Sequence, residues 1–225
     1  MSLLDAVVAA GEIPPDSAPQ ATKKRYSEVL SKHLAEETAD GLRALGFGGI
    51  RPLRGGPGEK AFQGGLGPKK VDVSYSDDQH GLHLAVSIKT ISFPTWGKNL
   101  KNRFSDMCTE AITLHMRFPY SVVCGLFAMP QRADEDISDQ RTTSTFRRAT
   151  ALFSTISGRS EYTDPGEKFE NMSMLLFRPL QPGIEPTATI VDCNSGQNRG
   201  EDEYFRSLLD IFNRRNPHLV IGDEL

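Results

Sequence analysis

Polar and apolar positions between residues 69 and 90 follow the pattern of two β-strands joined by a turn. The runs 69–75 and 82–90 carry β-branched and aromatic residues in alternation, and the segment 76–81 between them is dense in turn formers. This pattern predicts a β-hairpin. We place it at the centre of the sequence, because Asp72 lies near the start of its first strand and Lys89 near the end of its second.

Side chains of a strand point alternately to its two faces, which fixes the neighbours of Lys89 on the hairpin. Ser87, two positions earlier, is expected to share the face of Lys89, and so is His83. The apolar residues between them are expected to point to the other face. An acid and a lysine on paired strands, with a small polar residue beside the lysine, form the most informative constellation of the sequence.

Apolar periodicity predicts the other elements. Residues 21–45 are expected to form a long helix that ends at Gly46, and the near-continuous apolar run 120–129 suits a central strand buried on both faces. Shorter helices are predicted at 3–10, 100–118, 143–156 and 202–213, and strands at 172–177 and 187–191. The succession of helices and strands predicts an α/β fold.

No repeat or shift in composition divides the chain, so we expect one domain over residues 1–225. Its core is expected at about 21–130, with additional strands and helices over 131–225. The glycine-rich segment 55–68 lacks the residue order of a nucleotide-binding P-loop. It is predicted to be a connector whose amides and lysines could still touch phosphates.

A glutamate falls on the apolar side of the predicted helix 21–45. At about 100° per residue, Glu37 lies in the same stripe as Leu30 and Leu34, whereas Glu36 points away from that stripe. A carboxylate in such a position is costly unless something compensates its charge. Glu37 is therefore predicted either to form a salt bridge at the edge of the core or to serve a site.

Charge is distributed unevenly. The net charge is −3, which excludes a polycationic protein. Residues 51–70 nevertheless contain five basic residues against one acid, Glu59, and residues 89–103 contain four basic residues and no acid. Both segments flank the predicted hairpin, so a local positive field for a polyanion is predicted there, the alternative being two solvated loops.

Cysteine usage and hydropathy limit the setting. The three cysteines, Cys108, Cys124 and Cys193, match neither a disulfide framework nor a zinc site and are expected to be buried thiols. No apolar run reaches the ~20 residues of a membrane span, and the N-terminus lacks the pattern of a signal peptide. A cytoplasmic protein without a membrane partner is expected.

The hairpin offers the parts of a metal site. An aspartate at a strand kink is a good ligand for a hard divalent cation, and the backbone carbonyl of Ile88 is a second candidate oxygen ligand. Such an ion polarises a phosphoryl oxygen and lowers the pKa of a bound water. Lys89 beside it could position or deprotonate that water, or stabilise charge in the transition state.

The order of these features resembles the PD-(D/E)xK nuclease superfamily. The shared features are a helix with an acid, a strand with Asp72, a hairpin, a strand with Ser87-Ile88-Lys89, a helix and a buried strand. The resemblance covers about residues 25–130. It implies a restriction-endonuclease-like core, with a central mixed β-sheet flanked by helices, and Mg²⁺ or Mn²⁺ as cofactor.

The sequence departs from the superfamily at Ser87, where an aspartate or glutamate is usual. A serine hydroxyl is a poor metal ligand beside a carboxylate. The resemblance implies that an acid elsewhere replaces it, since relocated acids occur in the superfamily. Glu37 is the first candidate and Glu59 the second, and Ser87 and His83 are further possible site residues.

The resemblance implies a metal-dependent deoxyribonuclease that hydrolyses phosphodiester bonds, in prokaryotic restriction or anti-phage defence. Asp72 and Glu37 would hold the ion and Lys89 would assist the water. DNA is the expected substrate, with RNA as an alternative, and a homodimer or a targeting partner protein is expected. The residues predicted to contact nucleic acid are Lys60, Lys69, Lys70, Lys98, Lys101 and Arg103.

Two other functions fit the same residues. A nuclease-like module that has lost catalysis at Ser87 would bind nucleic acid or act as a structural or targeting subunit. In an unrelated α/β protein, Asp72 and Lys89 would form an ordinary cross-strand ion pair worth only ~0.2–1 kcal/mol if exposed. Nuclease assays and salt-dependent binding separate the three.

Overall fold

A mixed β-sheet forms the centre of the protein. The computed structural model describes residues 2–139 and 142–222, and within them six strands lie in the order β3-β4-β5-β6-β7-β8. β5 pairs in parallel with both β4 and β6, and the outer pairs are antiparallel. The strands are β3 (Val73–Asp77), β4 (Gly81–Thr90), β5 (Val122–Pro130), β6 (Asn171–Arg178), β7 (Thr187–Asp192) and β8 (Asn198–Arg199).

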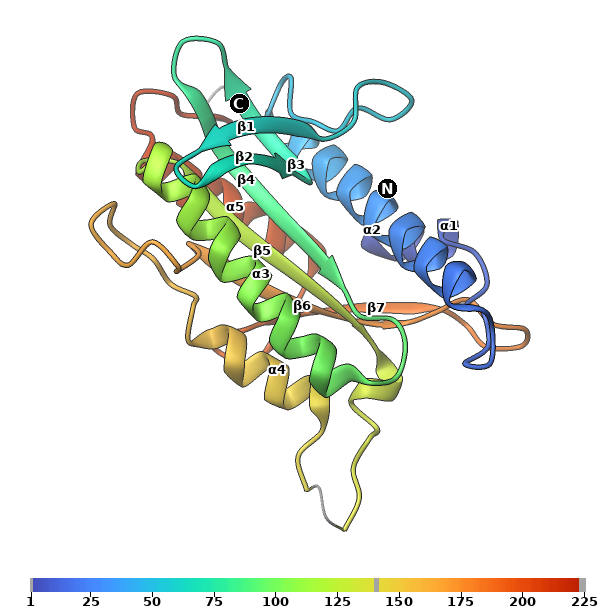
Figure 1. The fold of residues 1–225 in the computed structure, drawn as a ribbon. Coiled ribbons are helices and arrows are strands. Elements are labelled where there is room, and N and C mark those ends of the chain that lie inside the picture. Colours follow the sequence, from blue (N-terminus) through green and yellow to red (C-terminus); the bar gives the residue numbers. More distant parts are fainter. Residues whose placement is uncertain (1, 140–141, 223–225) are drawn as a thin grey trace.

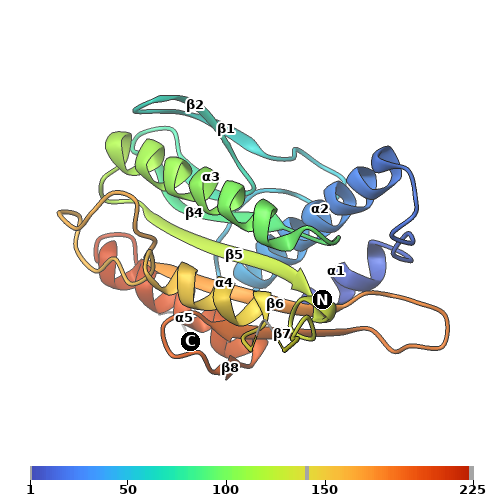
Figure 2. The same cartoon turned by 60° about the horizontal axis from the view of Figure 1, so that its bottom comes forward.

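Helices cover both faces of this sheet (Figures 1 and 2). One face carries α1 (Leu3–Ala9), α2 (Gln20–Ala44) and α5 (Glu201–Arg215). The other face carries α3 (Trp96–Arg117) and α4 (Thr145–Ser154), and a short 3-10 helix, Gln131–Ala133, follows β5. The predicted fold class, an α/β fold with a central mixed sheet flanked by helices, is confirmed.

The central strand β5 shows why the core forms two layers. Its residues are buried throughout, and they alternate between the two faces. Cys124 and Leu126 pack under α2 and α5, whereas Val123 and Phe127 pack under α3 and α4. The long apolar run at 120–129 thus predicted a strand buried on both faces correctly.

The glycine-rich segment contains a second small sheet, which the sequence analysis described wrongly as a connector. β1 (Lys60–Gly64) and β2 (Gly67–Val71) form an antiparallel hairpin beside α3. Gly64 allows the close approach, since a Cβ there would lie 2.5 Å from the Thr113 side chain. The Gly65 N–H donates to the Thr113 carbonyl over 2.8 Å, which fixes the hairpin to the helix.

The predicted first strand, residues 69–75, is divided at Asp72. Val71 ends β2, Val73 begins β3, and Asp72 is the single residue between the two strands. The backbone therefore leaves the small hairpin and enters the central sheet at this residue. The remaining predicted elements are present with shifted ends, the largest shift being at α3, which begins at Trp96 rather than Leu100.

A β-bulge interrupts the pairing of β3 with β4. Tyr75 lies opposite Leu84 and Ser76 opposite Leu82, so His83 is the extra residue. Leu82 packs with α3 and Leu84 with α2, although residues two apart normally share a face. His83 lies against the Tyr75 ring and not on the face of Lys89, so its predicted place beside Lys89 is wrong.

The segment after residue 130 belongs to the same sheet and cores. β6 continues the parallel part of the sheet, and Leu208 and Phe212 of α5 are fully buried against the layer that contains α2.

None of the helices in the described part of the chain combines the length and apolar character that a membrane crossing requires. Cys124 and Cys193 are buried free thiols, as the sequence predicts, whereas Cys108 is only half-buried.

Candidate active site

Asp72 is held at the edge of β4 by the backbone. The pairing of β3 with β4 ends at Val73 and Val86, so Ile88 lies beyond it. The Ile88 N–H donates instead to Asp72 Oδ2 over 2.7 Å. In a strand the N–H and C=O of one residue point to the same edge, so the Ile88 carbonyl faces the side of Asp72. The Asp72 carboxylate and the Ile88 carbonyl thus lie on the same edge of β4.

Lys89 lies between two carboxylates. Its Nζ is 3.2 Å from Asp72 Oδ2 and 3.2 Å from Glu110 Oε2. Glu110 comes from α3, and its side chain is 0% exposed. Lys69 Nζ lies 3.0 Å from the same Glu110 oxygen, so this carboxylate meets two ammonium groups. The structure therefore joins Asp72 and Lys89 to a buried glutamate that the sequence analysis did not name as a site residue.

Helical periodicity could have identified Glu110. It is three residues after Met107 and four before Leu114, both buried in the α3 layer. The same spacing selected Glu37 on α2. Glu110 was overlooked because its neighbours Asp106 and Arg103 are polar and exposed, which made the whole segment resemble a solvated face.

The charges in this cluster are strongly coupled. Burial raises the pKa of the Asp72 carboxyl; nearby Lys89 opposes this and Glu110 adds to it. Burial alone would lower the pKa of the Lys89 ammonium, but Glu110 and Asp72 outweigh it, and the pKa ends above its ordinary value. Lys89 is therefore protonated at neutral pH.

Glu110 is compensated in charge but not in hydrogen bonding. Two ammonium groups reach ion-pair distance, yet neither Oε1 nor Oε2 makes a hydrogen bond of good geometry within the described residues. The Ser87 hydroxyl, on the same face of β4 as Lys89, is also buried without a hydrogen bond. Buried polar groups in this state indicate a missing partner.

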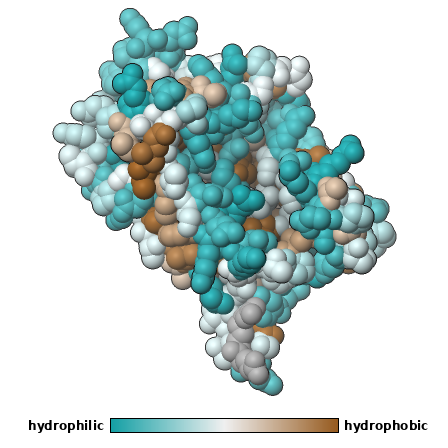
Figure 3. Space-filling view, viewed as in Figure 1, coloured by the Kyte–Doolittle hydropathy of each residue, from teal (hydrophilic) through white to brown (hydrophobic). Residues whose placement is uncertain are grey.

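A groove opens over this cluster. It has a volume of about 440 Å³ and runs between α2 and the end of β4. Figure 3 shows mostly hydrophilic surface over the space between α2 and α3. Two neighbouring hollows share its walls, of about 330 Å³ toward the glycine-rich segment and about 460 Å³ toward residues 92–95. The basic residues along the three are Lys23, Lys24, Lys32, Lys70, Lys89 and Arg103.

Glu37 does not join this site. Its Oε1 accepts a hydrogen bond of 2.6 Å from Arg54, which also binds Asp40. Within the described residues no hydrogen bond or ion pair connects Glu37 to Asp72 or Lys89. The placement of Glu37 beside Asp72 is thus corrected: Arg54 already neutralises it. Its neighbour Glu36, which the helical pattern set aside, lines the hollow that contains Asp72.

The other predicted site residues are dispersed around the groove. Glu59 is exposed and lines the groove beside Asp72. Lys70 and Arg103 also line it or the hollows next to it, whereas Lys60 donates to the Ser76 hydroxyl over 2.8 Å. Lys98 and Lys101 are exposed on the first turns of α3, and no pair contact is found for them in the described residues.

The donor set fits a hard divalent cation. Asp72, Glu110 and the Ile88 carbonyl offer oxygen atoms only, which suits Mg²⁺ or Mn²⁺. Both Glu110 oxygens are buried without hydrogen bonds, and an ion that bound them would take the place of the Lys69 or Lys89 ammonium group now at ion-pair distance. Glu110 would thus supply the acid that is absent at Ser87.

Comparisons with models of protein families, with curated proteins and with solved structures found no match. The relationship to the PD-(D/E)xK superfamily therefore stays a prediction that rests on Asp72, Ser87 and Lys89. Function has to be inferred from the geometry of the site itself.

Proposed function

We propose that this protein is a metal-dependent nuclease of the PD-(D/E)xK type. The observation that carries the proposal is the position of Lys89, whose Nζ lies 3.2 Å from both Asp72 and the buried Glu110. Lys89 lies at the wall of a groove that further basic residues line. Such an arrangement can bind phosphates and stabilise the negative charge that develops on a phosphate during hydrolysis.

Asp72, Glu110 and the Ile88 carbonyl would hold Mg²⁺ or Mn²⁺. When bound, the ion would act as a Lewis acid toward a phosphoryl oxygen and make a bound water more acidic. Lys89, which faces both carboxylates, would stabilise negative charge on the phosphate as it develops. Lys24, Lys32 and Arg103 along the groove would position the phosphate backbone.

DNA is the proposed substrate, and RNA is the alternative substrate to be tested. Activity on a supercoiled plasmid, a single-stranded DNA and an RNA of equal length, each with Mg²⁺ or Mn²⁺, identifies the substrate. The prokaryotic defence setting, the homodimer, the targeting partner and the cytoplasmic location stay predictions from the resemblance.

The decisive variants are Asp72→Asn, Lys89→Ala and Glu110→Gln. Each is expected to lower the rate ~100-fold or more, the usual cost of removing a group that stabilises the transition state. Asp78→Asn and Glu185→Gln, which change exposed acids outside the site, are the matched controls and should cleave at the wild-type rate. Circular dichroism checks that each variant is folded. Wild-type activity in the three site variants would refute the proposal.

A catalytically inactive module is the second candidate, and Glu110 favours it. This side chain is fully buried, and two lysines already compensate its charge, so an ion would have to displace them. Salt-dependent binding of nucleic acid without cleavage under either ion would support this function over the first. Absence of both activities would leave only the structural ion pair.

A further inference from the structure

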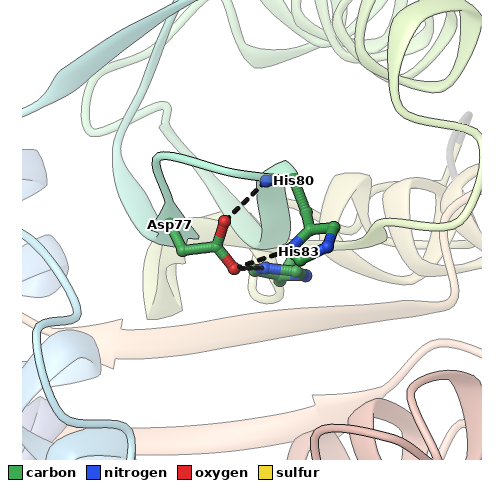
Figure 4. Close-up of side chains that lie close together, drawn as sticks. All are labelled: Asp77, His80 and His83. Atoms are coloured by element: carbon green, nitrogen blue, oxygen red, sulfur yellow. Dashed lines mark hydrogen bonds and ion pairs between the residues drawn. The ribbon is translucent and has the colours of Figure 1, made fainter.

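A second cluster of ligand-type side chains lies at the other end of the β3–β4 hairpin. Asp77 ends β3, His80 lies in the turn, and His83 is the bulged residue of β4. Their donor atoms all lie within 4.8 Å of one another. Figure 4 shows both imidazole rings directed at the Asp77 carboxylate. Neither the candidate active site nor the proposed nuclease function uses these residues.

The two rings converge on one oxygen atom. His83 Nε2 lies 2.6 Å and His80 Nδ1 3.2 Å from Asp77 Oδ2. Ligands of a tetrahedral zinc ion lie roughly 3.3 Å apart, given zinc–ligand distances of about 2.0–2.1 Å. The two nitrogen–oxygen distances are therefore close to the separation that zinc requires, and the two nitrogen atoms lie within 4.8 Å of each other.

The backbone prepares the carboxylate for this role. Asp77 Oδ1 accepts hydrogen bonds from the Gln79 and His80 N–H groups, over 2.8 and 2.6 Å. These bonds fix the carboxylate and leave Oδ2 directed at the rings. Gly81, with φ of +82°, turns the chain so that His80 and His83 face the same side. Hydrogen bonds that orient a ligand in this way are typical of metal sites.

We infer that Asp77, His80 and His83 form a binding site for a zinc-like transition-metal ion. Two imidazole nitrogens and one carboxylate oxygen suit zinc, whereas magnesium prefers oxygen ligands. The Asp77 and His80 side chains are 42% and 62% exposed, which leaves room for a solvent ligand at the fourth position. His83 is buried against Tyr75, which anchors the site in the fold. The bound ion ties the turn to the bulge.

The inference stands independently of the proposed nuclease function, because the two sites use different residues and different classes of ion. Each ring can donate to Asp77 only when the nitrogen that faces it carries a proton. Zinc would take the place of those protons, so each ring would bind as the neutral tautomer whose proton lies on its other nitrogen, and protonation of the rings in acid would compete with the ion. A metal requirement measured for cleavage must therefore be assigned to one of two sites.

Isothermal titration calorimetry of the untagged, chelator-treated full chain with zinc chloride tests the inference. We expect one ion per chain at this site, no comparable heat with magnesium chloride, and a rise in melting temperature with zinc. His80→Ala and Asp77→Asn should weaken zinc binding at least about tenfold, since even outer partners of a metal site contribute that much. The visible spectrum of the cobalt-substituted protein reports tetrahedral coordination independently.

Matched controls make the result specific. His218→Ala removes an exposed histidine and Asp78→Asn an exposed acid beside the site, and both should bind zinc as the wild type does. His80 is exposed, so its removal should leave the fold intact even if His83→Ala does not fold. Zinc affinity that is equal in wild type, His80→Ala and Asp77→Asn would overturn the inference and leave an ordinary hydrogen-bonded turn.

Discussion

Two buried glutamates, on helices that cover opposite faces of the sheet, are compensated in different ways. Glu37 on α2 accepts a hydrogen bond from the Arg54 guanidinium, which also donates to Asp40. Glu110 on α3 meets the ammonium groups of Lys69 and Lys89 at ion-pair distance without a well-formed hydrogen bond. Burial alone marks both carboxylates as costly. The partner decides which one is structural and which one remains available for chemistry.

The largest expected effect separates the two glutamates by activity. Under the proposed function, Glu110→Gln should lower the cleavage rate ~100-fold or more, because the charge that supports Lys89 and the metal ion is lost. Glu37→Gln should leave the rate nearly unchanged, since Glu37 has no contact with Asp72 or Lys89 in the described structure. Cleavage rates of the two isosteric variants, measured side by side, provide the test. Equal losses would show that the comparison is wrong.

The second effect is the loss of stability in the two glutamate variants. Glu37→Gln should reduce the free energy of unfolding by about 1–3 kcal/mol, because it removes a charge-assisted hydrogen bond at a buried position. Arg54 is 48% exposed and can turn toward water, so a value near the lower limit is expected. Glu110→Gln should cost more, since it leaves the Lys69 and Lys89 ammonium groups without the buried carboxylate that they face. Urea unfolding of both variants measures the difference, and a smaller loss for Glu110→Gln would contradict it.

The smallest effect is the pH dependence of stability. The folded-state pKa of Asp72 is raised above the ordinary value of 3.8, by burial first and with a contribution from Glu110. The folded chain thus holds this proton more tightly than the unfolded chain. The resulting stability is present below pH 3.8 and is lost as pH rises through the folded-state pKa.

Asp72→Asn removes this titration. The stability of wild type relative to Asp72→Asn should therefore fall between acid and neutral pH, as measured by unfolding at a series of pH values. In a Glu110→Gln background the fall should be smaller, because one cause of the raised pKa is absent. A fall of unchanged size would show that Glu110 does not act on Asp72.

The sequence predicted those elements whose residue pattern is compatible with only one kind of secondary structure and burial. The apolar run that became β5 can only be buried on both faces, and the long helix α2 follows from its stripe of Leu30 and Leu34. β1 and the first residues of β2 were missed because glycine, proline and lysine are frequent in them, and the hairpin is held to α3 by the contact with Thr113. Such tertiary contacts leave no local pattern.

The candidate site was predicted in part for the same reason. Ile88 and Lys89 donate hydrogen bonds to the Asp72 carboxylate just beyond the end of the strand pairing, where the hairpin pattern already brings the two segments together. Glu37 and Glu110 satisfy one periodicity rule equally well, and the choice between them depends on Arg54 and Lys69, which come from other segments. The Asp77–His80–His83 cluster depends on a bulge that alternation cannot predict.

Asp72 is the only residue between β2 and β3, and this has a mechanical consequence. The β1–β2 hairpin carries Lys69 and Lys70, and one end of it is tied to α3 through Thr113. Any rotation of the hairpin against the central sheet has to be taken up by the backbone dihedrals of Asp72. A force on Lys69 or Lys70 would therefore be transmitted to Asp72, the proposed metal ligand.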